Sequence, residues 1–283
     1  MLSSQAQLKL TTDSRPEMLL KIDHQTRYQY TAPVTFALQQ LRTRPLSSRC
    51  QTVIDWKISL KGAKLQTSFV DQHGNHVDLV ELESGTEEIV ISVSGEVETI
   101  ETNGVLGRHT LAMPLWFYLR QSDLTKPGPQ IDKLIESLDA PDRRDVLTLH
   151  ALSAMILERV AYKTGQTGIQ TTAEAALEHA AGVCQDHTHI FLSAARELGF
   201  PARYVSGYLM MDDRIEQEAS HAWAEAHIDG LGWVGFDVSN SISPDERYVH
   251  VARGTDYRDA APTTGFLVGA QGENLVVSLQ VQQ

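Results

Sequence analysis

Residues 19–100 carry the pattern that most restricts the fold, an alternation of apolar and polar side chains with a period of two. The alternation is clearest in residues 20–30 and 54–60, and glycine- and asparagine-containing turns separate the runs. Short alternating strands joined by such turns predict an antiparallel β-sandwich. We expect this domain to occupy residues 18–110, after a polar, mobile extension at residues 1–17.

The hydrophobic period changes in the second half of the chain. Apolar residues recur at steps of three and four from Val146 to Val160, which predicts a helix. Thr171–Glu174 resembles a capping box that opens a short helix, and a third, buried helix starts near Cys184. The strands expected after these helices are residues 201–208, 221–228, 232–236, 248–252 and 274–281. Helices followed by an antiparallel sheet indicate the α+β class, with this second domain at residues 111–283.

Composition excludes several classes of partner. The chain has 283 residues and a formal net charge of −12, which argues against binding to nucleic acid or to an anionic membrane surface. It contains no apolar run near the roughly 20 residues of a membrane span. The N-terminus lacks the pattern of a signal peptide, and two cysteines are too few for a disulfide framework. We therefore expect a cytoplasmic protein, and the sequence does not specify its oligomeric state.

Cys184 is the first candidate for chemistry. Ala181-Gly182-Val183 leads into Cys184, and an apolar run follows, so the cysteine is expected at a helix N-terminus, where the helix dipole favours a thiolate. A free thiol with a pKa of about 8.5 is a weak nucleophile at neutral pH until a base activates it. A buried structural role is the alternative for a lone cysteine.

His221 and Asp237 complete a possible catalytic group. His221 opens one expected strand and Asp237 closes the next, and the two ends of a short hairpin lie side by side. The aspartate can orient the imidazole, which can in turn activate the thiol. Taken alone, His221 could be a packed histidine and Asp237 a turn residue. The combination predicts a Cys184–His221–Asp237 site with neither metal nor cofactor.

Aromatic residues surround this predicted site. Tyr208, Trp223 and Trp233 lie on the expected strands, and such residues are usually part of a core. As an alternative, one or two of them could form the walls of a cleft that holds an extended peptide.

Other polar residues invite a metal interpretation, which the spacing does not favour. Cys184 and His187 share one face of a helix whereas Asp186 and His189 share another, so the four cannot converge on one ion. Asp186 is better explained as a first-turn carboxylate that points away from the thiol or meets a partner. His187 could support the site, but a packed histidine is the simpler explanation.

Three further residues are expected to take no part in the chemistry. His73 and His76 lie in a polar turn and are expected to be solvated. Cys50 is expected to have a structural role, although a bridge to Cys184 would be possible. The charged segment at residues 211–219, directly before His221, could gate a cleft.

The chain resembles the bacterial branch of the transglutaminase-like superfamily, whose core is a papain-like thiol fold. The matching segments are Thr171–Glu174, Gly182–Asp186, Pro201–Tyr208, Ser220–Trp223, Gly232–Asp237, Ser243–Tyr248 and Asp256–Asp259. The β-rich first domain resembles the N-terminal region that accompanies this core in bacterial members. The resemblance implies Cys184 as nucleophile, His221 as general base and acid, and Asp237 as the orienting residue.

Three functions fit these expectations. The first is a thiol hydrolase that cleaves a peptide or isopeptide bond, with a peptide or protein as substrate. The second is a transamidase that joins glutamine to an amine acceptor. The third is a non-catalytic peptide-binding module on the same fold.

Overall fold

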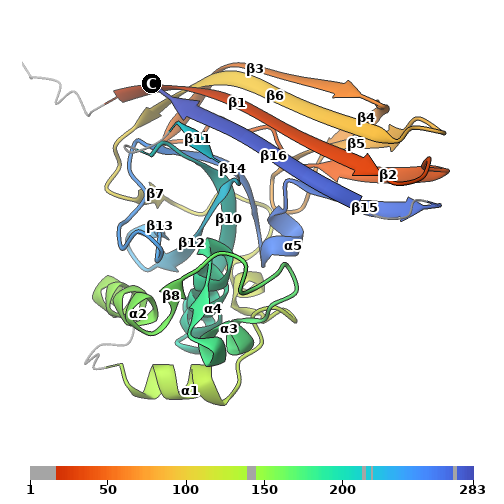
Figure 1. Cartoon of the computed structure of the whole chain (residues 1–283). Coiled ribbons are helices and arrows are strands. Elements are labelled where there is room, and N and C mark those ends of the chain that lie inside the picture. Colours follow the sequence, from red (N-terminus) through yellow and green to blue (C-terminus); the bar gives the residue numbers. More distant parts are fainter. Residues whose placement is uncertain (1–16, 139–144, 212–214, 218, 270–272) are drawn as a thin grey trace, which may run out of the picture.

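The computed structural model describes residues 17–138, 145–211, 215–217, 219–269 and 273–283. Figure 1 shows long strands stacked on one side of the molecule and, on the other, a shorter sheet with helices against it. The predicted α+β class is confirmed by this arrangement. Residues 1–16 of the expected extension lie outside the described residues, and Glu17 already belongs to the first strand.

The N-terminal domain is the predicted antiparallel sandwich. One sheet has the order β11-β16-β1-β6-β3 and the other β15-β2-β5-β4. These strands are β1 (Glu17–Tyr30), β2 (Phe36–Leu41), β3 (Gln51–Lys61), β4 (Ala63–Val70), β5 (His76–Leu82), β6 (Glu88–Ile100), β11 (Glu216–Gln217), β15 (Thr263–Val268) and β16 (Glu273–Gln282). Alternate side chains of both sheets fill the space between them, including Tyr28, Leu41 and Ile91.

The second domain is built on a third antiparallel sheet with the order β14-β10-β12-β13-β7. Its strands are β7 (Val105–Gly107), β10 (Ala202–Leu209), β12 (His221–Ile228), β13 (Gly232–Phe236) and β14 (Tyr248–Gly254). The helices are η1 (Leu115–Leu119), α1 (Pro129–Glu136), α2 (Val146–Arg159), α3 (Ala173–His179), α4 (Cys184–Glu197) and α5 (Tyr257–Ala260). No helix within the described ranges is both long and apolar enough to cross a membrane.

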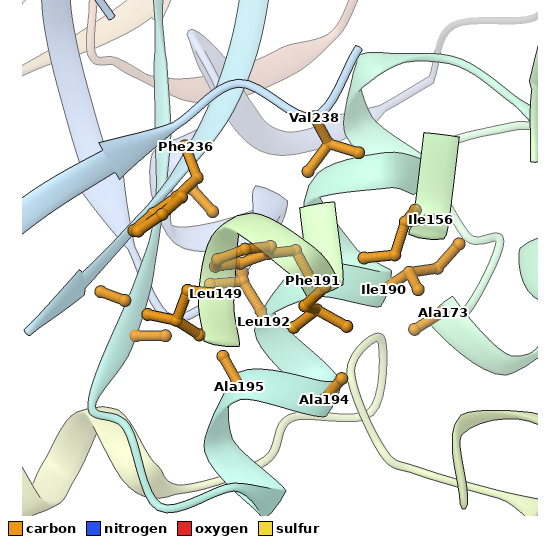
Figure 2. Packing of buried hydrophobic residues seen from close by; sticks show 14 of the residues in the cluster. Leu149, Ile156, Ala173, Ile190, Phe191, Leu192, Ala194, Ala195, Phe236 and Val238 are labelled. Atoms are coloured by element: carbon orange, nitrogen blue, oxygen red, sulfur yellow. The ribbon is translucent and has the colours of Figure 1, made fainter. Parts of the chain in front are cut away.

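Helix α4 is held against this sheet by a large apolar core. Figure 2 shows Phe191 on α4 close to Phe236 on β13, and the two rings stack with centroids 5.0 Å apart. Leu149 and Ile156 of α2 belong to the same core, and Leu149 lies close to Phe191. The start of α4 is therefore anchored by burial of its central turns, which positions Cys184.

Some strands pair with the sheet of the domain that lies in the other half of the chain. β16 near the C-terminus pairs with β1, and β15 pairs with β2, so residues 274–281 do not extend the second-domain sheet as expected. Conversely, β7 leaves the N-terminal region to pair with β13. A period-two pattern defines which side chains are buried but leaves the partner strand open. The predicted domain boundary at residue 110 is therefore crossed by these strand pairings, and it remains a prediction.

Thr172 is expected to contribute measurably to stability as the N-cap of α3. Its Oγ1 accepts a hydrogen bond from the backbone N–H of Ala175 at 3.2 Å, whereas Glu174 caps α1 by accepting from Gln130 N at 2.7 Å. Thr172→Ala should lower the free energy of unfolding by about 1 kcal/mol in urea titrations. Glu178→Ala, at an exposed position of the same helix, is the control and should change little; equal losses would contradict the capping role.

Candidate active site

Cys184 is the first residue of α4, as predicted. The preceding strand β9 (Ala181–Gly182) pairs in parallel with β8 (Ala161–Tyr162), which fixes the entry of the chain into the helix. The thiol is partly buried, and both cysteines are free, so Cys184 forms no bridge to Cys50. A helix begins with N–H groups that have no intrahelical acceptor, and Cys184 lies among these donors.

Asp186 meets a partner rather than the thiol. Its Oδ2 accepts hydrogen bonds from Val183 N at 2.8 Å and from Thr167 Oγ1 at 2.6 Å. A Cβ at Gly182 would approach the Asp186 side chain to within 2.6 Å, so only glycine fits beside this folded-back carboxylate. The expectation that Asp186 engages a partner is confirmed.

His221 and Asp237 face one another across the β12–β13 hairpin. The register pairs Ala224 with Phe236, which brings the start of β12 to the end of β13. His221 Nε2 donates a hydrogen bond to Asp237 Oδ2 at 2.6 Å. His221 is 7 % exposed and Asp237 is completely buried, so solvent screens this ion pair weakly.

Two residues that sequence reasoning missed hold Asp237 in place. Tyr248 Oη and Asn240 Nδ2 each donate to Asp237 Oδ2 at 2.7 Å. Burial raises the pKa of Asp237, but the His221 charge and these hydrogen bonds outweigh it and lower that pKa. Burial likewise raises the pKa of Tyr248, with the Asp237 charge adding to the effect, so Tyr248 remains a donor.

The same contacts keep His221 protonated. Burial lowers the pKa of His221, but the Asp237 charge, the hydrogen bond to it and a hydrogen bond to the Cys184 side chain raise that pKa to about 10. Because Nε2 faces Asp237, Nδ1 is the ring nitrogen left for Cys184. An imidazolium fixed between a carboxylate and a thiol is the arrangement that can stabilise a thiolate.

This raised pKa predicts a specific dependence of stability on pH. A group whose pKa rises on folding stabilises the protein fully below its unfolded value, and the gain is lost as pH rises toward the folded value. Between pH 6.5 and about 10, the wild-type protein should lose free energy of unfolding that His221→Gln does not lose. Urea titrations across this range measure the difference, and parallel pH curves would contradict it.

An open cleft lies beside His221. Its volume is about 580 Å³, and its lining includes His221, Asn240, Tyr248, Tyr162, Met210 and Met211. The Trp223 ring stacks against His221 with centroids 6.2 Å apart and an interplanar angle of 29°. Trp223 is 2 % exposed, so it supports the imidazole from behind. Residues 212–214 and 218 of the proposed gating segment lie outside the described residues.

The other two aromatic candidates are core residues away from this cleft. Tyr208 is buried between the domains and its hydroxyl hydrogen-bonds to His24 Nδ1 at 2.9 Å. Trp233 is also buried, and its Nε1 donates to His109 Nδ1 at 3.1 Å. Of the three aromatic residues, only Trp223 lies against His221. Tyr208 and Trp233 are packed in the interior, away from this cleft.

The two histidines within α4, His187 and His189, are packed. His187 is fully buried between Ser239 Oγ and the Val160 carbonyl, each at 2.9 Å, and His189 Nε2 accepts from Tyr257 N at 3.2 Å. Across the described residues, no group of three or more His, Cys, Asp or Glu side chains is arranged to hold a metal.

One turn expectation was wrong. His73 is 1 % exposed rather than solvated, because the turn folds against η1 and α5: Nε2 lies 3.3 Å from Asp259 Oδ2. Its neighbour His76 is half-buried and hydrogen-bonds to Asp78 Oδ1 at 3.1 Å.

Comparison with known proteins gives this fold a family. Residues 20–98 match the family model of the bacterial transglutaminase-like N-terminal region, and residues 132–238 match that of the transglutaminase-like superfamily. The chain belongs to the transglutaminase-like superfamily, in the form that carries the bacterial N-terminal region.

Relatives extend over nearly the whole chain. An uncharacterized protein of Mycobacterium leprae is 28% identical over 282 residues, which cover 93% of this chain and 98% of that one. An uncharacterized protein of Mycobacterium tuberculosis is also 28% identical over 288 residues, 92% and 91% of the two chains. A crystal structure of a "putative cysteine protease" from Cytophaga hutchinsonii has a TM-score of 0.73 at 21% identity and covers 94% of this chain and 98% of that one. This likeness extends to the fold of both domains.

Proposed function

We propose that this protein is a thiol-dependent hydrolase that cleaves the amide bond of a peptide or isopeptide. Cys184 is the nucleophile, His221 the general acid and base, and Asp237 the residue that orients His221. The observation that carries the proposal is the position of His221, which is held by Asp237 at 2.6 Å and whose pKa, despite burial, is raised by that carboxylate and, to a smaller extent, by the Cys184 side chain at the start of α4. The description of the Cytophaga neighbour as a "putative cysteine protease" supports the same class of reaction.

The chemistry follows from this arrangement in two stages. Cys184 Sγ attacks the carbonyl carbon, His221 gives its proton to the leaving nitrogen, and the C–N bond breaks to leave a thioester. Water then attacks the thioester, His221 accepts a proton from it, and the C–S bond breaks. The backbone N–H of Cys184 is a donor for the oxyanion in both stages. Asp237 stays ionised throughout and keeps Nδ1 directed at the sulfur.

The first test is alkylation by iodoacetamide over a range of pH, with peptide mass mapping of the two cysteines. Cys184 should be labelled rapidly below pH 7, and His221→Ala should slow this labelling. Cys50 is an internal control, because burial raises the pKa of its thiol, and its labelling should be slow in both proteins. Labelling of Cys184 that rises only near the free-thiol pKa of about 8.5, and that is unchanged in His221→Ala, would overturn the proposal.

The second test identifies the acceptor. Glutamine-containing peptides and casein are incubated with the protein, with and without a primary amine, and the products are measured by mass spectrometry. Hydrolysis predicts cleaved or deamidated peptides under both conditions. Incorporation of the amine in place of water would instead assign the transamidase reaction, because both reactions share the thioester.

A further inference from the structure

A second cavity lies toward the other end of the core sheet from His221. Its volume is about 520 Å³, and its lining includes Arg49, Arg108, Arg203, Arg253 and the Trp233 side chain. Among the described residues, no carboxylate lines it. Four arginines in one cavity are unexpected in a chain with a formal net charge of −12, so the local charge is opposite to that of the whole protein.

Arg203 is buried and rigidly placed. Its Nε donates to Glu225 Oε2 at 2.6 Å, and its guanidinium lies 4.0 Å from the centre of the Trp233 ring. The other Glu225 oxygen accepts from His250 Nε2 at 2.5 Å. Both carboxylate oxygens of Glu225 are therefore already bound, one to Arg203 and the other to His250.

Arg253 lacks a comparable partner. Its buried Nε has no hydrogen-bond acceptor in the described part of the chain. Asp71, the other carboxylate near it, is paired with Arg42 at 3.4 Å and bonded to Asn75. Burial, with the positive charge of Arg203, lowers the pKa of Arg253 to about 10. A partly buried cation with a buried, unpaired Nε beside a like charge favours binding of an anion.

The other two arginines lie at the rim. Arg49 and Arg108 are exposed, and neither forms an ion pair with any described residue. Guanidinium groups bind phosphate and carboxylate oxygens in bidentate geometry. One buried arginine (Arg203), one partly buried arginine (Arg253) and two exposed arginines thus offer donors at different depths of the same cavity.

We propose that this cavity binds a small molecule with at least two anionic groups, phosphates or carboxylates, between the inner arginines (Arg203 and Arg253) and the rim arginines (Arg49 and Arg108). The cavity shares no lining residue with the cleft beside His221. It is a separate site, and its occupancy does not depend on the thiol chemistry.

Calorimetric titration of the full-length protein with diphosphate and with citrate tests the proposal. At least one of the two should bind, and Arg49→Ala combined with Arg108→Ala should weaken that binding about tenfold or more. These exposed positions leave Arg203 and Arg253 intact, so the unliganded melting temperature should not change. Preference for diphosphate assigns a phosphate ligand, and preference for citrate assigns a carboxylate ligand.

The control is Arg159→Ala, an exposed arginine at the end of α2, which should bind the anion as the wild type does. Equal weakening in this control would show diffuse attraction to surface charge and would overturn the site. The proposal would also be overturned if neither anion, at millimolar concentration, produced binding heat or raised the melting temperature of the protein.

Discussion

Cys184→Ala is expected to abolish amide hydrolysis, and His221→Ala is expected to lower kcat/KM by about 10²- to 10⁴-fold. The sulfur forms the covalent bond, so nothing replaces it. The imidazole supplies the proton to the leaving group, a role that water can fill slowly. Turnover of the best peptide found in the product screen measures both losses.

The two substitutions should not be additive. Residues that act as one unit lose their function together, so Cys184→Ala with His221→Ala should be no less active than Cys184→Ala alone. His227→Ala is the matched control, because His227 lies on the same strand β12 but packs against Trp233, and its activity should remain close to wild type. If His221→Ala were as active as this control, His221 would have no part in the reaction.

The parts of the site that sequence could predict are those set by local geometry. Cys184 follows a chain reversal and starts an apolar helix, and a short hairpin brings His221 to Asp237. Tyr248 could not be placed in this way, because it reaches Asp237 from β14, a strand that pairs with β10 rather than with the hairpin. Asn240 had a usable signal, since it lies three residues after Asp237 in a turn.

In the fold, too, features set by neighbouring residues could be predicted from the sequence, whereas pairings between distant segments could not. Alternation predicted the sandwich and the change of period predicted α2, both from side chains that share a face. The return of β16 to β1 and of β7 to β13 depends on pairing between distant segments. For the same reason Trp233 could be read as a cleft wall or as core. The packing of His109 and Arg203 against its ring shows that Trp233 is not a wall of the cleft beside His221 but lies at the edge of the core, next to the arginine cavity.

Glu225→Ala is expected to destabilise the protein by about 3–5 kcal/mol, because it leaves the buried Arg203 without its counter-charge. Glu225 is completely buried and hydrogen-bonds to both Arg203 and His250. Burial raises the pKa of Glu225, but the charges of Arg203 and His250 outweigh it and lower that pKa. The stabilisation is therefore present above the unfolded pKa and is lost as pH falls. Urea titrations at neutral and acidic pH measure both effects.

The matched comparison is Glu96→Ala, which removes a strand carboxylate paired with Lys21 at 3.5 Å on the surface. An exposed pair of this kind contributes less than about 1 kcal/mol, so the two glutamates separate the effect of burial from that of charge pairing. Glu225→Gln should retain part of the lost stability through its remaining hydrogen bonds, and should lose less free energy of unfolding than the wild type on acidification. A loss in Glu225→Ala no larger than in Glu96→Ala would show that Arg203 finds another partner or reaches water, and that this ion pair does not hold the sheet behind His221.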